Sequence, residues 1–173
     1  MPDATIRLAT VEDAEPIRAI YNHEVTTSTA TFDLVPRSLD EQRAWLAARS
    51  GAFSAIVAVR GGDACGGYGD DDVVGFASLS PYKERAAYRT TVEDSVYVHR
   101  MHTGRGIGRL LLVELVGIAR DSGFHSVVAR IEAGGAASRA LHAACGFDLV
   151  GVERQVGRKF GRWLDVAVMQ IVL

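Results

Sequence analysis

The sequence predicts one mixed α/β domain over residues 1–173, with a central sheet of about six or seven strands flanked by about four helices. Two observations support this prediction. Runs rich in β-branched and apolar residues alternate along the chain with longer segments of helical periodicity. The composition, 48% apolar and 23% charged, is that of a globular chain able to bury a core, and no repeat or linker divides it.

The first strand and the first helix are expected near the N-terminus. Thr5–Ala9 alternates between apolar and polar residues, as a strand does. Thr10 is a suitable N-cap, with Asp13 three residues later in place of the usual Glu or Gln. The helix that follows has one apolar face, formed by Ile17, Ile20 and Tyr21.

A polar run and a second helix come next. Thr26–Thr31 is rich in β-branched hydroxyl residues and is expected to be a loop, either over a cavity or as a plain solvated connection. Ser38 and Glu41 have the spacing of a reciprocal capping box, so a second helix is expected to begin there. Trp45 and Leu46 are expected on its buried face.

Two strands are expected on either side of a glycine-rich loop. Phe53–Val59 and Val73–Leu79 are apolar runs, and Pro81 ends the second. Residues 61–72 between them are dominated by glycine and aspartate and are expected to form a surface hairpin loop. The acids of this loop lack the spacing of a calcium site, so no metal site is expected.

The central strand is expected over Thr91–His99, and it leads through a glycine turn into a long helix. That helix runs to about Ser122 and ends at Gly123 in the C′ position. It is apolar almost all the way round, so other parts are expected to cover it on more than one side. The remaining elements are a strand over Ser126–Ile131, a helix over Ala136–Cys145 that stops at Gly146, and strands over Phe147–Val152 and Trp163–Leu173 joined by the basic turn Gly157–Arg162.

The overall composition argues against several classes of protein. A formal net charge of −2 gives no basic field for nucleic acid. No run of about 18 apolar residues is present, so no membrane-spanning helix is expected. The N-terminus lacks the features of a signal peptide, and Cys65 and Cys145 lie far apart. We therefore expect reduced thiols without a disulfide, in a cytoplasmic protein.

The glycine turn has the composition of an anion-binding site. Gly104, Gly106 and Gly108 expose the backbone at the start of a helix, where unpaired N–H groups and a partial positive charge favour an anion. Arg105 and Arg109 add positive charge. The pattern lacks the final spacing of the Rossmann fingerprint and the Lys-Ser/Thr of the Walker motif. It predicts a phosphate-bearing ligand, although a tight strand–helix junction without a ligand would also need glycines.

The surrounding segments resemble a known family. Thr103–Gly108, after a strand and before an apolar helix, resembles the acetyl-CoA pyrophosphate loop of the GNAT superfamily of N-acyltransferases. Gly135–His142, followed by Gly146 and Phe147, resembles the fourth helix of that superfamily. More narrowly, the segments that resemble phosphinothricin and methionine sulfoximine N-acetyltransferases are Tyr21–His23, Pro81–Tyr88, Thr91–Val98 and Val156–Asp165. The likeness covers nearly the whole chain in order.

This resemblance implies the GNAT fold, acetyl-CoA as co-substrate and no metal. The residues that it places against acetyl-CoA are Val96, Tyr97, Val98, Gly104, Arg105, Gly106, Ile107, Gly108, Arg109, Gly135 and Ser138. The chain departs from the superfamily pattern at three positions. Thr103 stands in place of Gln or Arg, Gly135 in place of an Asn that contacts the pantetheine arm, and His142 in place of a Tyr beside the leaving sulfur.

The resemblance also implies direct attack of a substrate amine on the thioester. An amine with a pKa of about 10 must lose a proton before it attacks. Glu93 matches the general base of the resembled subfamily, and its alternative role is a partner for the substrate ammonium or a structural acid. Strict alternation places Glu93, Ser95, Tyr97 and His99 on one face of the strand and Val92, Val96 and Val98 on the other, unless a bulge changes the parity.

Other residues are expected to act on the thioester and the substrate. A strand-edge N–H near Val98 can stabilise the oxyanion, and His142 can protonate the departing thiolate unless it is a packed, hydrogen-bonded histidine. An anionic amino-acid-like substrate needs positive charge and an aromatic wall. Lys83, Arg85 and the pair Arg158–Lys159 offer the charge, and Tyr88 offers the wall. The alternative is that these basic residues form a solvated face.

The expected function is N-acetylation of a small amino-acid-like amine of the phosphinothricin, methionine sulfoximine or methionine sulfone type. Two alternatives remain: acetylation of another amine, such as a polyamine or a peptide N-terminus, and a non-catalytic acyl-CoA-binding sensor. The apolar long helix and the segment Lys159–Trp163 leave surface to cover, which favours a homodimer.

Overall fold

The computed structural model describes residues 4–61 and 72–173. Its strands are β1 (Thr5–Leu8), β2 (Ala55–Arg60), β3 (Asp72–Pro81), β4 (Thr91–Val98), β5 (Ser126–Glu132), β6 (Asp148–Lys159) and β7 (Arg162–Val172). Its α-helices are α1 (Ala14–Thr27), α2 (Leu39–Ala47), α3 (Ile107–Asp121) and α4 (Ala136–Ala144). Within the described residues, the strands form one seven-stranded sheet in the order β1-β2-β3-β4-β5-β7-β6. The mixed α/β fold predicted from the sequence is therefore confirmed.

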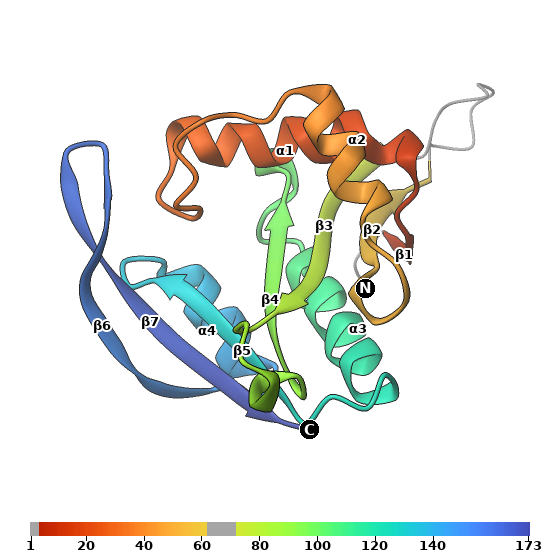
Figure 1. Cartoon of the computed structure of the whole chain (residues 1–173). Coiled ribbons are helices and arrows are strands. Elements are labelled where there is room, and N and C mark those ends of the chain that lie inside the picture. Colours follow the sequence, from red (N-terminus) through yellow and green to blue (C-terminus); the bar gives the residue numbers. More distant parts are fainter. Residues whose placement is uncertain (1–3, 62–71) are drawn as a thin grey trace.

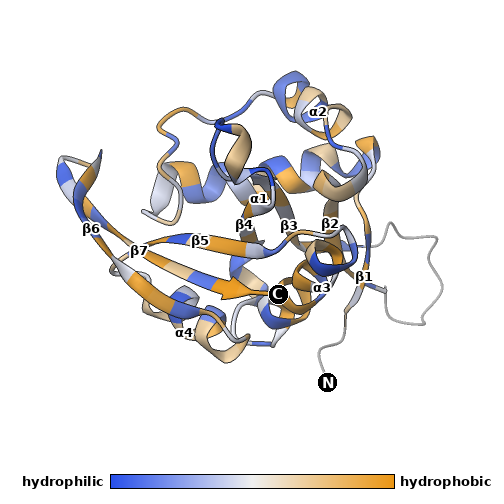
Figure 2. Cartoon of the chain, turned by 60° about the horizontal axis from the view of Figure 1, so that its bottom comes forward, coloured by the Kyte–Doolittle hydropathy of each residue, from blue (hydrophilic) through white to orange (hydrophobic). Residues whose placement is uncertain are grey.

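The sheet is antiparallel except at its centre, where β4 and β5 are parallel. Figure 2 shows α1 and α2 on one side of the sheet and α3 and α4 on the other. Each side has its own core, because successive side chains of a strand point to opposite faces. Ala55, Val57 and Val59 of β2 pack with α1 and α2, whereas Ile56 and Ala58 pack with α3.

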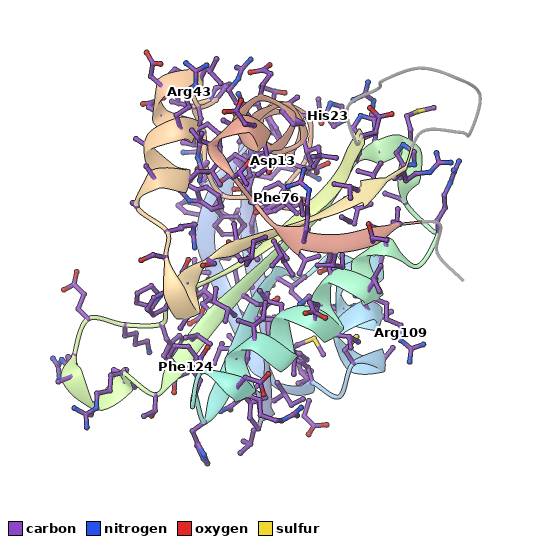
Figure 3. All side chains as sticks on the ribbon, turned by 90° about the vertical axis from the view of Figure 1, so that its right-hand side faces the viewer. Asp13, His23, Arg43, Phe76, Arg109 and Phe124 are labelled. Atoms are coloured by element: carbon purple, nitrogen blue, oxygen red, sulfur yellow. The ribbon has the colours of Figure 1, made fainter. Side chains whose placement is uncertain are left out.

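Figure 3 labels Phe76 of β3, which lies between the sheet and α1. Its ring stacks on Tyr97 at a centroid distance of 5.2 Å and meets Tyr21 of α1 edge-on at 6.5 Å. These aromatic contacts fix α1 against the middle of the sheet. They also hold Tyr21 and Tyr97 in place, and both residues line a cavity in the protein.

The two predicted helix starts differ in outcome. The capping box at Ser38 and Glu41 is present: Ser38 donates its backbone N–H to the Glu41 carboxylate at 2.7 Å, and Glu41 returns its N–H to Ser38 Oγ at 3.2 Å. At Thr10 the predicted reciprocal pair also forms, but it caps a short 3₁₀ turn over Val11–Asp13. The helix α1 itself begins only at Ala14. On α2, Gln42 and Leu46 are buried, whereas Trp45 is half-buried.

Two expectations about long segments need correction. The predicted loop over residues 26–31 begins only at Ser28, because Thr26 and Thr27 complete the last turn of α1. Their hydroxyls donate back to the carbonyl oxygens of Asn22 and His23 within the helix. The helix α3 is not covered on more than one side by its own chain. It buries a single stripe, and Val113 is 54% exposed.

The C-terminal hairpin is longer than predicted. The strands β6 and β7 pair as far as Lys159 and Arg162, so most of the predicted turn over residues 157–162 belongs to strands. The connection is the two residues Phe160 and Gly161, whose φ angles of 49° and 75° fit a type I′ hairpin turn. Lower in the hairpin, the register shifts between Glu153 and Gly157.

Three sequence expectations concern membranes, metals and thiols. None of the helices within residues 4–61 and 72–173 has the length and apolar character needed to span a membrane. Those same residues contain no cluster of three or more His, Cys, Asp or Glu side chains that would hold a metal ion. Cys145 is a free thiol, whereas Cys65 and residues 62–71 of the expected loop lie outside the described part of the chain.

Candidate functional site

A cavity of about 630 Å³ opens where β4 and β5 separate. The two strands pair only from Thr91 to Glu93, opposite Ser126 to Val128, and Figure 1 shows them diverging beyond that point. The cavity is lined by the Ser28–Phe32 loop, by β4 and β5, by the start of α4 and by the β6–β7 hairpin. Tyr21 and Glu24 of α1 complete the wall, so segments from both faces of the sheet meet at this gap.

Glu93 lies on the cavity wall at the last paired position of β4. Burial raises the pKa of its carboxyl, the nearby charge of Arg130 opposes the rise, and Asp94 and Glu153 add to it. Within the described residues, no hydrogen bond or ion pair joins the Glu93 carboxylate to another side chain or to the backbone, although the Glu93 backbone is part of the sheet. The other acids on the wall, Glu24, Asp94 and Glu132, all have hydrogen-bond partners. Glu93 is thus a half-buried carboxylate with its acceptors open to a ligand.

The predicted parity of β4 is correct. The β3–β4 register runs without a shift from Gly75 opposite Val98 to Pro81 opposite Val92, so no bulge interrupts alternation in this ladder. Val92 belongs to the core that contains α3, and Val96 and Val98 pack against it. Tyr97 faces the core of α1 and α2 instead.

The backbone of β4 supplies donors to the gap. His99 donates its N–H to the carbonyl oxygen of Val74 at 2.9 Å, so the odd-numbered positions bond β3. Alternation along an antiparallel strand then turns the N–H groups of Val96 and Val98 to the opposite side, towards β5. Because β5 no longer pairs with β4 at this level, these two N–H groups are not used in the β4–β5 ladder; Val96 lines the cavity, whereas Val98 is not among its lining residues.

Asp94 is a site residue that the sequence analysis missed. It falls on the apolar face of β4 with Val92 and Val96, where its carboxylate is almost completely buried. Its Oδ2 atom lies 2.9 Å from Nε2 of His142 on α4. The sequence contained a usable signal, because an acid at a core position of a strand requires a polar or cationic partner on the helix that covers it.

His142 is buried with both ring nitrogens engaged. Its Nδ1 atom lies 2.7 Å from the carbonyl oxygen of Ser138, and Nε2 lies against Asp94. Burial lowers its pKa, but the hydrogen bond and charge of Asp94, with the Ser138 carbonyl, raise the pKa on balance. Since a carbonyl oxygen accepts only, Nδ1 carries a proton, and the second proton is held between Nε2 and Asp94. To protonate a departing sulfur, His142 must break one of these two hydrogen bonds.

The glycine turn leads from β4 into α3, as predicted. Gly104 and Gly106 have φ angles of 74° and 80°, values that favour glycine. Gly106 is the N-cap of α3 and offers no side chain, so the first N–H groups of this 15-residue helix remain open to a ligand. Arg105 is exposed beside the turn, and Figure 3 shows Arg109 pointing away from the body of the protein. The Ile107 side chain is buried, so the group that Ile107 can present to a ligand is its backbone N–H.

Two of the departures from the superfamily pattern have local explanations. The Thr103 hydroxyl donates to the carbonyl oxygen of Arg100 at 3.2 Å, so it already has a partner within the turn. A Cβ atom on Gly135 would lie 3.0 Å from the carbonyl oxygen of Glu132 and 3.3 Å from Ile131 Cγ2. The backbone before α4 is thus too close for a larger side chain. Gly108 likewise allows close packing, because a Cβ there would lie 3.1 Å from Leu141 of α4.

The predicted substrate residues Lys83, Arg85 and Tyr88 lie apart from Glu93. With Glu84 they line a second hollow of about 410 Å³, and no residue of that hollow lines the cavity at Glu93. The Lys83 ammonium lies 5.2 Å from the Tyr88 ring centroid. The structure of one chain therefore brings these three residues together with one another, but not with the predicted base.

Comparisons with known proteins agree with this geometry. Residues 17–147 match the acetyltransferase (GNAT) family. The chain is 42% identical over 170 residues, 98% of its length and 95% of the relative's, to an L-methionine sulfoximine/L-methionine sulfone acetyltransferase of Pseudomonas paraeruginosa (strain DSM 24068 / PA7).

Two solved structures are also similar. One is a GNAT superfamily phosphinothricin acetyltransferase from Sinorhizobium meliloti in complex with acetyl-CoA, with a TM-score of 0.89 and 37% identity, covering 99% of this chain and 89% of that one. The other is described as a ribosomal-protein-alanine N-acetyltransferase from Brucella melitensis, with a TM-score of 0.89 and 40% identity, covering 98% and 99%. The chain belongs to the GNAT family of acetyltransferases.

Proposed function

We propose that this chain, as one domain in the cytoplasm, transfers the acetyl group of acetyl-CoA to the amine of a small amino-acid-like substrate. Phosphinothricin, methionine sulfoximine and methionine sulfone are the candidate substrates, because the chain resembles enzymes named for them. The observation that carries the proposal is Glu93: its carboxylate has a raised pKa, has no hydrogen-bond partner within residues 4–61 and 72–173, and lies on the wall of a cavity at the gap in the sheet. The free Cys145 thiol fits a reducing compartment.

The residues of the site have separate parts in this reaction. Glu93 takes a proton from the substrate ammonium, directly or through water, and so frees the amine lone pair for attack on the thioester carbon. The N–H of Val98 stabilises the negative charge that develops on the carbonyl oxygen. The carbon–sulfur bond then breaks, the sulfur leaves with the electron pair and takes up a proton, and the nitrogen loses its second proton to solvent as the amide forms. His142 supplies a proton or positive charge on the α4 side of the cavity.

The acetyl-CoA end of the site fits the glycine turn. The open N–H groups at the start of α3 and the cations Arg105 and Arg109 suit a pyrophosphate. Val96 and Tyr97 on β4 and Ser138 on α4 line the cavity on the way from the turn to Glu93. Binding would depend mainly on backbone donors, because the Thr103 hydroxyl is used within the turn.

The amino-acid substrate also carries a carboxylate, and the cavity is acidic. The only arginine among the described residues that line it, Arg130, is bound by Glu153. We therefore propose that the chain works as a homodimer in which Lys83, Arg85 and Tyr88 of one copy serve the cavity of the other. Exposed apolar side chains on β6, among them Leu149, Val150 and Val152, provide surface for such a contact.

Release of the CoA thiol with a panel of amines tests the activity. The panel contains phosphinothricin, methionine sulfoximine, methionine sulfone, a polyamine and a peptide with N-terminal alanine, the last because of the name of the Brucella neighbour. Turnover with the first three supports the proposal, and preference for a polyamine or the peptide replaces it. Tight acetyl-CoA binding without turnover of any amine favours a sensor.

Mixing two inactive variants tests the shared site. Glu93→Gln and Arg85→Ala copies are purified, mixed, unfolded and refolded together. If the two residues act in one site across the dimer, each mixed dimer regains one intact site, and activity recovers to about a quarter of the wild-type value. No recovery means that Arg85 does not act across the dimer. Full activity of Arg85→Ala alone removes Arg85 from the site.

A further inference from the structure

Lys159 was expected to offer a cation to the substrate, but its side chain is 3% exposed and faces the protein. It is the last residue of β6, opposite Arg162 across the hairpin turn. Its ammonium donates to the carbonyl oxygen of Thr31 at 2.7 Å and to that of Glu24 at 3.4 Å. The first acceptor lies within the Ser28–Phe32 loop and the second lies in α1, just before it. One side chain of the hairpin therefore ties the loop and the end of α1 to a strand about 130 residues away in the sequence.

Other contacts join the same two segments. Phe32 packs directly on Gly157, because a Cβ atom on Gly157 would lie 2.1 Å from Phe32 Cε2. On the opposite side, Thr29 donates its hydroxyl to Glu132 of β5 at 3.0 Å. The Ser28–Phe32 loop and Val156 of the hairpin both line the cavity that contains Glu93. The hairpin therefore shapes the cavity through the loop as well as directly.

A contribution to stability does not explain why a lysine occupies position 159. Burial lowers the pKa of the Lys159 ammonium, although the charges of Asp33 and Glu24 oppose the shift. Both hydrogen bonds that the ammonium makes go to neutral carbonyl oxygens. A buried charge held in this way is costly, and an apolar side chain of similar length would fill the same space without that cost.

We propose that Lys159 is a positioning residue for the amine substrate: it holds the Ser28–Phe32 loop over the cavity and so sets the affinity for the amine, not the rate of acetyl transfer. This inference rests on the proposed function, in which the cavity at Glu93 receives the amine. The Ser28–Phe32 loop then forms a wall of the cavity, and the position of this wall depends on the hairpin. The space between the loop and the hairpin limits the size of the substrate.

Lys159→Met tests this role, because methionine keeps an unbranched side chain and removes the charge. The matched control is Arg162→Met, which removes one positive charge from the exposed neighbouring position of the same hairpin. Steady-state kinetics gives the KM for the amine and for acetyl-CoA. Hydrogen exchange of residues 28–35 without ligands measures the loop independently of any activity.

For Lys159→Met we expect the amine KM to rise about tenfold, since a charge-assisted hydrogen bond is lost. The kcat at saturating amine and the acetyl-CoA KM stay near wild type, the loop exchanges faster, and the melting temperature does not fall. Arg162→Met changes none of these. An unchanged amine KM with unchanged loop exchange overturns the proposal, as does a general loss of stability. If no amine is turned over by the wild type, the proposed function fails, whereas the exchange data still decide whether Lys159 fixes the loop.

Discussion

The substitution Glu93→Gln isolates the proposed proton transfer. Glutamine keeps the shape of the side chain, and the Glu93 carboxylate accepts no hydrogen bond from the described residues, so the change breaks no hydrogen bond among them. The loss therefore measures chemistry. Removing a general base lowers the rate by about 10²- to 10⁴-fold, which corresponds to about 3–5 kcal/mol of barrier. We expect kcat/KM to fall within that range while the Kd for acetyl-CoA stays unchanged.

The dependence on pH gives a second measurement from the same variant. Because the pKa of Glu93 is raised above 4.5, the wild-type kcat/KM should rise with pH around the raised value, and this limb should vanish in Glu93→Gln. Ionising Glu93 in the folded state costs stability. The contribution of Glu93 to the free energy of unfolding therefore declines as pH rises from 4.5 through the folded pKa. At neutral pH the variant should melt at the same temperature as the wild type or higher.

Thiol release between pH 5 and 9, calorimetry with acetyl-CoA and thermal melting provide these data. Glu114→Gln is the control, because Glu114 is an exposed carboxylate on α3 outside the cavity. Activity of Glu93→Gln above about a tenth of wild type, with the pH limb retained, would refute the role of Glu93 as base. Loss of acetyl-CoA binding would show that it serves another purpose.

The other predictions concern the buried pair and the turn. Asp94→Asn should lower the free energy of unfolding by about 1–3 kcal/mol. The folded pKa of His142 lies above 6.5. The Asp94–His142 pair therefore contributes fully to the free energy of unfolding below pH 6.5, and this contribution is lost as pH rises through the folded pKa. Urea unfolding at pH 6 and pH 9 checks this, and an equal loss at both contradicts it. Gly106→Val places a β-branched residue at a φ of 80°, so acetyl-CoA binding by calorimetry should disappear while circular dichroism stays native; retained binding would contradict the turn's role.

Much of the site could be predicted because it depends on short-range patterns. The parity of β4 follows from a period of two, which placed Glu93 opposite the valine face correctly. The capping box at Ser38 and the glycine that ends α3 are also local signals. The hairpin turn was predicted too long, because Phe160 adopts a positive φ that its residue type does not indicate in the sequence.

The residues that were missed act across long distances in the chain. Asp94 and His142 meet only because α4 covers the gap beside β4, although the position of Asp94 among valines was a warning. Lys159 looked like one of several basic surface residues, and nothing near it in the sequence reveals that Thr31 supplies its acceptor. The placement of Lys83, Arg85 and Tyr88 away from Glu93 likewise depends on how the connection before β4 turns.

The gap between β4 and β5 also has a mechanical consequence. Three residue pairs join β1–β4 to β5–β7 along this line, and the Asp94–His142 contact supports them from the side. The sheet therefore consists of two halves joined by few hydrogen bonds, and the cavity lies along this junction. A ligand that hydrogen-bonds to both strands would add contacts between the two halves. We expect it to slow amide exchange across the whole sheet, far from any atom that it touches.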